Sequence, residues 1–449
     1  MLPLNFIRQN SDLVKQNNRI RKCAVSVDEI LRLDDERKKL IAEADALRAQ
    51  VNEKSREGRP SEEEIARLRE IKEKITNYEL RITNTESELN MLLVQLPNIT
   101  HESVPVGKDD TENVVYKKWS PSDSREGSIA TPSFAIKPHW EIGRALDLID
   151  EEKGAKVAGS RFWYLKNELV YLEFALVHYA LEFLKKEGFT PMIPPTIVRE
   201  RALYGTGFFP ADENEIYLLA NPETEEGEDT EIPNPKSQIP NPITSWNQPT
   251  QYLIGTAEVP LAAYHADETI DVTKPLKYCG FSSCFRREAG TYGKDMKGIL
   301  RGHQFDKIEM FIFSSERDSW DIHEYLRECA EEFWQSLKIP YRVMLMCSGD
   351  IGPPNAKKYD IEAWMPGETS PTGGQGRYRE IVSASNDTDF QARRLNIKYK
   401  DADEKKQYAH TLNSTLVAIG RAIIAIMENY QTKEGSVLIP EVLKPYMFG

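Results

Sequence analysis

The chain has 449 residues, which is long enough for two or three domains. It carries 71 acidic and 58 basic residues, a net charge of −13. This balance argues against nucleic-acid binding over the whole chain, because attraction to phosphates needs a local excess of Lys and Arg. Hydrophobic residues make up 40% and aromatic residues 9% of the chain, which excludes general disorder.

Neither a membrane segment nor a secretion signal is indicated. The longest apolar stretch, 416–427, has 12 residues and is interrupted by Arg421, whereas a membrane span needs ~20 residues. The N-terminus MLPLNFIRQNSD lacks a charged region followed by an apolar one. Five scattered cysteines are typical of a reducing compartment. We therefore expect a cytoplasmic protein.

Residues 27–97 show a heptad pattern. One row of apolar residues, Leu33, Leu40 and Leu47, precedes a break at 58–60, and a second row follows it at positions 68, 75, 82, 89 and 96. Ser61 with Glu64 three residues later is a capping box that begins a helix. These features predict an antiparallel coiled-coil hairpin that projects as an arm. The alternative, a helical pair folded back on the main body, would need a wider apolar stripe.

The next segments are more varied. Residues 98–155 are rich in turns and are expected to connect two domains. Residues 167–186 predict a buried helix that is apolar on most of its circumference, with His178 as a core histidine. Short alternating segments then predict strands at 251–254, 277–286, 304–313, 342–346, 360–364 and 379–383.

Strands that follow one another, with long helices only at the ends, predict an α+β domain with an antiparallel sheet flanked by helices. No glycine-rich phosphate loop follows any strand, so a Rossmann or P-loop nucleotide site is not expected. Residues 221–250 contain six prolines, six acidic residues and one lysine. We predict a surface loop there, and a tolerated insertion is favoured over a functional one.

Four polar clusters fall where an antiparallel sheet would bring them together. They are FRRE at 285–288, RGHQFDKIE at 301–309, REIVSASN at 379–386, and TLNST at 411–415 followed by Gly420 and Arg421. In the second cluster, alternation puts Lys307 and Glu309 on one face, and Glu309 is costly to bury unless it is paired. Each cluster alone is more typical of a structural ion pair or a solvated face.

Together these clusters closely resemble a seryl-tRNA synthetase of the bacterial type, a class II aminoacyl-tRNA synthetase. The resemblance runs from LNFIRQNSDLVKQ to PEVLKPYMFG. The helix at 167–186 with GFTPMIPP resembles motif 1, FRRE motif 2, and TLNSTLVAIGR motif 3. The triplet at 256–258 in IGTAEVPLAAYH resembles the serine-binding TAE loop. The resemblance implies an N-terminal tRNA-binding domain, 1–110, and a class II catalytic domain, 111–449.

The resemblance implies that the enzyme activates L-serine with ATP and transfers serine to the 3′ end of tRNA(Ser). Arg286 and Arg421 are the implied catalytic residues, with Arg286 on the α-phosphate, Glu288 on the adenine amino group, and Arg421 and Arg301 on the γ-phosphate. Mg²⁺ is implied at Glu380 and Ser383, which offer the hard oxygen ligands that it prefers. The full implied ATP site is Arg286, Arg287, Glu288, Arg301, Glu380, Ile381, Val382, Ser383 and Arg421.

Glu309 matches the carboxylate that faces the substrate serine. The implied serine site is Thr256, Ala257, Glu258, Arg286, Glu309, Asn413 and Thr415. A small site built to bond a hydroxyl group rejects alanine, because its polar groups would be left unpaired. Thr415 stands where some members carry Ser; both present a hydroxyl group.

The hairpin is implied to contact the long variable arm of serine tRNAs. Between 27 and 97 there are 13 basic and 17 acidic residues, so the hairpin is not an electrostatic funnel. Basic residues cluster near its tip, and a local stripe of this kind can follow an RNA backbone. The tRNA-binding candidates are Lys54, Arg56, Arg59, Arg67 and Arg69; a solvated coiled coil is the alternative. A homodimer with Pro195 at its interface is also implied, and the question whether tRNA(Sec) is a second substrate stays open at this point.

Three alternative interpretations of the sequence are less favoured. Cys279 and Cys284 could suggest zinc, but their spacing and the lack of a nearby His favour structural cysteines. A relative that charges a carrier protein would lack the tRNA-binding arm, which this chain retains. A catalytically dead homologue would have lost Arg286, Glu309, Glu380 or Arg421, and all four are present.

Overall fold

A computed structural model of the chain describes residues 1–54, 61–121, 134–219, 250–289, 297–369 and 375–447. Residues 1–99 form one compact unit, and the described residues from Thr100 onward form a second. The acidic, proline-rich segment predicted at 221–250 lies outside the described residues except for its last position. No helix in these described ranges is long and apolar enough to cross a membrane.

The first unit consists of four helices: α1 (Leu4–Gln9), α2 (Ser11–Ile20), α3 (Val27–Lys54) and α4 (Glu62–Leu93). The short helices pack on the base of the longer pair through a small core that includes Ile7, Val14, Ile30, Leu89 and Leu96. The N-terminal helical region predicted from the sequence is therefore confirmed.

The two long helices show the predicted heptad pattern. Leu33, Leu40 and Ala44 are buried in α3 and lie at the predicted heptad spacing. An ion pair between Arg48 of α3 and Glu79 of α4, at 2.8 Å, links the two helices. The capping box at the start of α4 is confirmed: the Ser61 hydroxyl accepts from the Glu64 N–H at 3.3 Å, and the Glu64 carboxylate accepts from the Ser61 N–H at 2.8 Å.

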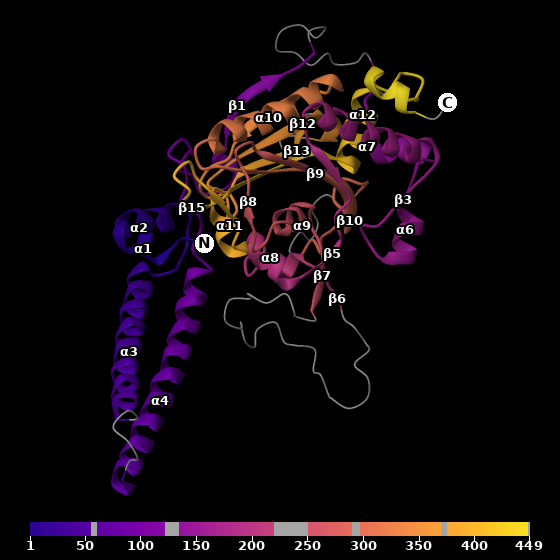
Figure 1. The fold of residues 1–449 in the computed structure, drawn as a ribbon. Coiled ribbons are helices and arrows are strands. Elements are labelled where there is room, and N and C mark those ends of the chain that lie inside the picture. Colours follow the sequence, from indigo (N-terminus) through magenta and orange to yellow (C-terminus); the bar gives the residue numbers. More distant parts are fainter. Residues whose placement is uncertain (55–60, 122–133, 220–249, 290–296, 370–374, 448–449) are drawn as a thin grey trace. The chain divides into compact units, whose positions relative to one another are not determined.

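The second unit is built on an eight-stranded sheet (Figure 1). In spatial order the strands are β1 (Val114–Trp119), β11 (Tyr341–Leu345), β12 (Lys357–Thr369), β13 (Gln375–Asn386), β16 (His410–Ala418), β10 (Gln304–Ser314), β9 (Leu276–Phe285) and β4 (Thr190–Met192). Every neighbouring pair is antiparallel except β4 with β9. The predicted α+β class is confirmed.

Helices cover both faces of this sheet. On one side lie α7 (Glu168–Lys186), α10 (Ser319–Ser336) and α12 (Ile419–Asn429), and on the other α8 (Glu200–Thr206), α9 (Glu258–Ala263) and α11 (Phe390–Leu395) (Figure 1). Alternate residues of β10 enter different cores: Ile308 and Met310 face the first group, and Phe311 faces the second. The predicted alternation of this strand is therefore correct.

Smaller elements surround the sheet. Two of them are helices, α5 (His139–Ala145) and α6 (Glu151–Ala158). One small sheet pairs β2 (Ile149–Asp150) with β3 (Tyr164–Leu165), and a second has β7 (Gln251–Leu253) between β5 (Ile197–Arg199) and β6 (Leu218–Leu219). A third has β14 (Lys398–Lys400) between β8 (Thr269–Ile270) and β15 (Lys406–Tyr408).

Two local predictions were wrong. The turn-rich segment 98–155 is more than a connector, because it contributes β1 to the edge of the main sheet, along with α5 and α6. His178 is exposed and contacts the ring of Tyr446, so it is not a core histidine. The helix that carries it, α7, also exposes Phe174 (59%) and Tyr171 (46%), so its apolar surface is only partly covered within this chain.

Candidate functional site

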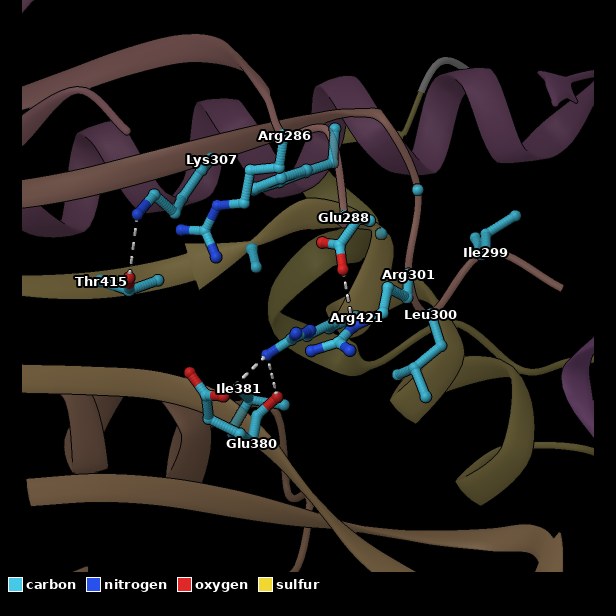
Figure 2. Close-up of a pocket in the computed structure, with 14 residues that line it drawn as sticks. Arg286, Glu288, Ile299, Leu300, Arg301, Lys307, Glu380, Ile381, Thr415 and Arg421 are labelled. Carbon is cyan, nitrogen blue, oxygen red and sulfur yellow. Dashed lines mark hydrogen bonds and ion pairs between the residues drawn. The ribbon is translucent and has the colours of Figure 1, made fainter. Parts of the chain in front are cut away.

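A pocket opens where β9, β10, β13 and the start of α12 meet. Its walls combine three arginines, one lysine and two carboxylates with apolar side chains (Figure 2). The lining residues are Arg286, Glu288, Ile299, Leu300, Arg301, Gly302, Phe305, Lys307, Glu380, Ile381, Thr415, Ala418, Gly420 and Arg421.

The three arginines come from different elements. Arg286 follows β9; its Nε donates to the Gly255 carbonyl at 3.3 Å, and its guanidinium lies 5.4 Å from the centre of the Phe305 ring. Arg301 lies before β10, and its Nε is 3.1 Å from a Glu288 carboxylate oxygen. Arg421, in the first turn of α12, donates to the Glu380 carbonyl at 2.7 Å. The pocket therefore gathers three cations on a fixed frame.

Glu288 reaches this pocket because the chain turns after β9. Its φ of +51° places it in the left-handed region, which an L-residue rarely adopts. Glu288 and Arg286 line the same cavity. Both come after the end of β9 at Phe285, so the turn and not strand alternation directs them there.

A buried polar cluster adjoins the pocket at Lys307 and Thr415. Lys307 Nζ is 2.6 Å from the Glu309 carboxylate, and it donates to the Thr256 hydroxyl at 2.8 Å. The Thr415 hydroxyl donates to the same Glu309 oxygen at 3.1 Å. Glu309 is 2% exposed and Lys307 6%. The costly burial of Glu309 noted from the sequence is thus offset by an ion pair and hydrogen bonds.

The register of β10 with β16 brings these groups together. A bulge between Ile308 and Glu309 pairs Glu309 with Thr415, instead of with Leu416. Behind them, Asn413 on β16 donates to the Glu258 carboxylate at the start of α9, at 3.2 Å. The serine-site residues inferred from the resemblance therefore converge, except that the side chain of Ala257 packs into the core beneath α9.

Glu380 and Ser383 lie on β13 beside the pocket. Burial acts to raise the pKa of Glu380, but Arg421, Lys358 and Arg286 outweigh it, and the pKa is lowered. Ser383 lies opposite Asp360 in the register of β13 with the neighbouring strand β12. Burial raises the pKa of Asp360 to about 7. Glu380 is half exposed and lies 3.5 Å from Arg421. A carboxylate and a hydroxyl group on one strand are ligand types that suit a hard divalent cation.

Some of the expected ATP-site residues lie elsewhere. Ile381 lines the pocket, but Val382 is buried in the core. Arg287 is exposed and does not line the pocket; its backbone N–H donates to the Glu215 carbonyl. Of the expected tRNA-binding residues, Lys54, Arg67 and Arg69 are exposed, whereas Arg56 and Arg59 lie outside the described residues. Pro195 is exposed.

Lys307 and Phe305 are site residues that sequence reasoning did not single out. Both share a face of β10 with Glu309, so the predicted alternation of this strand could have found them. Ile299 and Leu300 carry no such signal, because apolar residues before a strand are common. Cys279 and Cys284 are buried and are not part of this pocket.

Comparisons with known proteins found relatives that match both units of the chain. Residues 1–100 match the family model of the seryl-tRNA synthetase N-terminal domain, and residues 243–430 match the tRNA synthetase class II core domain (G, H, P, S and T). The serine–tRNA ligase of Pyrococcus horikoshii is 43% identical over 99% of this chain and 96% of its own length. That of Treponema denticola is 42% identical over 99% of this chain and 98% of its own.

Solved structures show the same similarity. The crystal structure of seryl-tRNA synthetase from Pyrococcus horikoshii complexed with ATP has a TM-score of 0.85 at 42% identity, covering 100% of this chain and 98% of that one. The cytoplasmic serine–tRNA ligase from Naegleria fowleri in complex with AMP has a TM-score of 0.82 at 34% identity, covering 100% and 97%.

Proposed function

The chain belongs to the seryl-tRNA synthetase family, and from this premise we propose how its residues divide the work of a serine–tRNA ligase. The enzyme joins L-serine to ATP, giving seryl-adenylate and pyrophosphate, and transfers serine to tRNA. One observation carries the assignment: the pocket with three arginines and the buried Glu309 cluster share Lys307 and Thr415. Subsites for a polyphosphate and for a small polar amino acid are therefore adjacent.

ATP occupies the pocket lined by the arginines. Arg286 binds the α-phosphate, because its planar fork can grip phosphate and carboxylate oxygens at once. Arg301 and Arg421 take the γ-phosphate end, and Glu288 accepts from the adenine amino group. Relatives solved in complex with ATP and with AMP support a nucleotide as a ligand of this chain.

The chemical step needs charge neutralisation and not a general base. The attacking group, the serine carboxylate, is already an anion at neutral pH. As the bond to the α-phosphorus forms and pyrophosphate leaves, negative charge builds on the phosphoryl oxygens. Fixed guanidinium groups stabilise that charge without reorganising, and they bring the two reactants into line. Arg286 and Arg421 are accordingly the catalytic residues in this proposal.

Serine binds beside Glu309. Its hydroxyl group donates to the Glu309 carboxylate, and Thr256, Glu258, Asn413 and Thr415 complete the site. Alanine cannot supply the hydrogen bond that the serine hydroxyl group gives to Glu309, and sites built for such a bond discriminate by ~10⁴-fold or more. The ion pair with Lys307 supports this assignment, because it fixes the Glu309 carboxylate before the substrate arrives.

Glu380 and Ser383 would hold Mg²⁺. When bound, the ion neutralises negative charge on the phosphates of the nucleotide. The lowered pKa of Glu380 keeps its carboxylate ionised and available for this role.

Residues 1–110 form the tRNA-binding domain in this proposal, and the hairpin contacts the variable arm of tRNA(Ser). The basic residues Lys54, Arg56, Arg59, Arg67 and Arg69 follow the RNA backbone, and tRNA(Sec) is a second possible substrate. The catalytic unit, 111–449, pairs in a cytoplasmic homodimer through the exposed apolar face of α7 and Pro195. Phe174 and Tyr171 support that interface, because large apolar side chains on one helix face favour a partner.

ATP–pyrophosphate exchange tests the activity directly. We expect serine, but not alanine, to stimulate the exchange in the presence of Mg²⁺. Replacing Arg286 by Ala should lower the exchange rate by about 10³-fold or more, because it removes a charge that stabilises the transition state. Arg317→Ala is the matched control, since this arginine is 89% exposed and does not line the pocket. Exchange that does not depend on serine would contradict the assignment.

A further inference from the structure

A second, fully buried carboxylate lies behind the serine subsite. Asp387 is 0% exposed and sits between β13 and α11. Its backbone is fixed on both sides, because its N–H donates to the Thr411 carbonyl and its carbonyl accepts from the Phe390 N–H. Because it has no exposed surface, we assign it no direct contact with a substrate.

One amide group joins this carboxylate to Glu258. Asn413 Nδ2 donates to the Asp387 carboxylate at 3.1 Å and to the Glu258 carboxylate at 3.2 Å. An amide nitrogen carries two hydrogens, so both are used. The other Asp387 oxygen accepts from Asn355 Nδ2 at 2.6 Å, and Glu258 also accepts from Gln391 Nε2 at 2.7 Å. This orientation of Asn413 directs both of its N–H groups at carboxylate oxygens.

We propose that Asp387 is a positioning residue for serine: it fixes Asn413 and, through it, the orientation and charge of Glu258, which meets the ammonium group of the substrate. This inference rests on the proposed function and names a residue beyond it. Glu258 retains part of its exposure, whereas Asp387 has none, so only Glu258 can reach a ligand.

The surrounding charges support this role. Burial, together with the neighbouring Asp387 and Glu309, raises the pKa of Glu258 to about 8; Lys307 opposes the shift but is already paired with Glu309. Burial raises the pKa of Asp387 to about 7, against its hydrogen bonds from Asn355 and Asn413. Two carboxylates bridged by a neutral amide therefore keep a proton near neutral pH, and an arriving ammonium ion supplies the charge that lets both ionise.

The pH dependence follows from this arrangement. When Glu258 is protonated it cannot pair with an ammonium group, so kcat/KM for serine should rise as the pH increases between about 7 and 8. Asp387→Asn removes the neighbouring negative charge, so Glu258 ionises at a lower pH and the rise moves toward acid. The substitution also removes one negative charge from the surroundings of the substrate ammonium group. The new amide NH₂ would face Asn355 Nδ2 or Asn413 Nδ2, which are themselves donors.

Steady-state ATP–pyrophosphate exchange with varied serine, from pH 6 to pH 8.5, tests the inference on the full chain. For Asp387→Asn we expect KM for serine to rise about tenfold at pH 8.5, with kcat and KM for ATP little changed. The difference should shrink or invert below pH 7. Asp387→Ser, which removes the charge with a smaller side chain, should shift the profile in the same direction.

Glu331→Gln is the matched control. Glu331 is also a buried carboxylate, and it accepts from Arg327 and from the Tyr341 hydroxyl at 2.7 Å, far from the pocket on α10. It should lower the thermal unfolding temperature without moving the serine pH profile. Parallel profiles for the wild type and both Asp387 variants would overturn the inference. A wild-type enzyme without serine-dependent exchange would instead refute the proposed function.

Discussion

Gly298 shows how closely the pocket wall depends on one residue. It has a φ of +73°, and an added Cβ would lie 1.9 Å from His139 Nε2. That nitrogen accepts from the Ile299 N–H at 3.1 Å, while His139 Nδ1 donates to the buried Glu428 at 3.0 Å. The chain that brings Ile299 and Arg301 into the pocket is therefore anchored through His139 to α12.

Replacing Gly298 by Ala should break this anchor. We expect the free energy of unfolding to fall by about 2–4 kcal/mol, because the new methyl group clashes with His139 and the left-handed backbone adds strain. KM for ATP should rise several-fold while KM for serine stays nearly constant. Chemical denaturation and exchange kinetics measure these effects. Gly188→Ala is the control, since Gly188 has a φ of +83° but open space around it, so only the backbone term of about 1–2 kcal/mol remains.

At the same scale, the sequence allowed us to predict which side chains of β10 share a face. It did not allow us to predict the hydrogen bonds among the polar side chains behind that strand. Alternation alone places Lys307 and Glu309 on one face. Asn355, Asp387 and Asn413 meet only because separate strands and a turn converge. No periodicity links them, since side-chain hydrogen bonds between distant segments are set by the tertiary fold.

Among the elements, α3 depends on a buried carboxylate near its N-terminal end. Asp34 is 1% exposed and bonds to Lys38 at 2.6 Å, Arg8 at 2.7 Å and Arg37 at 3.2 Å. Burial acts to raise the pKa of Asp34, but the three cations outweigh it, and the pKa lies below its usual value. A carboxylate of this kind stabilises the fold above its unfolded pKa, and the contribution is lost as the pH falls through the folded value.

We therefore expect Asp34→Asn to destabilise the first unit by about 2–3 kcal/mol at pH 7, since buried donors lose a charged acceptor. The difference from the wild type should narrow as the pH falls below about 4. Urea unfolding followed by circular dichroism at several pH values measures both effects. Asp35→Asn is the control, because Asp35 bonds to the same Arg8 but is 62% exposed. A pH-independent difference would contradict this account.

Two elements show where pattern analysis of the sequence fails. β1 is exposed at five of its six residues, so it lacks the alternation that marks a half-buried strand. α7 has the apolar composition of a buried helix, yet Phe174 and Tyr171 are exposed. Composition cannot separate apolar surface that packs within one chain from apolar surface left for another.

For the whole molecule, the two units have different proposed roles: the first binds tRNA, and the second contains the pocket in which serine is activated. The core of the first unit lies at the base of the hairpin, around Leu33 and Leu89, and α3 and α4 extend well beyond it. The catalytic pocket is built entirely from the second unit. Shortening the hairpin should therefore leave amino-acid activation intact.

Deleting residues 41–81 and joining the ends with a short Gly–Ser turn tests this separation. We expect serine-dependent pyrophosphate exchange to stay within about twofold of the wild type, while kcat/KM for tRNA falls by about 10²-fold, because phosphate and shape contacts along the arm are lost. Aminoacylation of tRNA(Ser) measures the loss. A shortened enzyme that charges tRNA at the normal rate would remove the proposed role of the arm.

The bulge in β16 has a consequence for how the two substrates meet. Thr415 and Ala418 both face the pocket although they are three residues apart, while Leu416 and Val417 enter the core between them. An unbroken strand would send Thr415 and Ala418 to opposite faces. The additional residue changes the phase of the strand, and the Trp334 indole N–H bonds the Leu416 carbonyl at 3.1 Å at that point. In the proposed assignment, the distance between the serine and nucleotide subsites is therefore set by the number of residues in this strand and not by the choice of side chains.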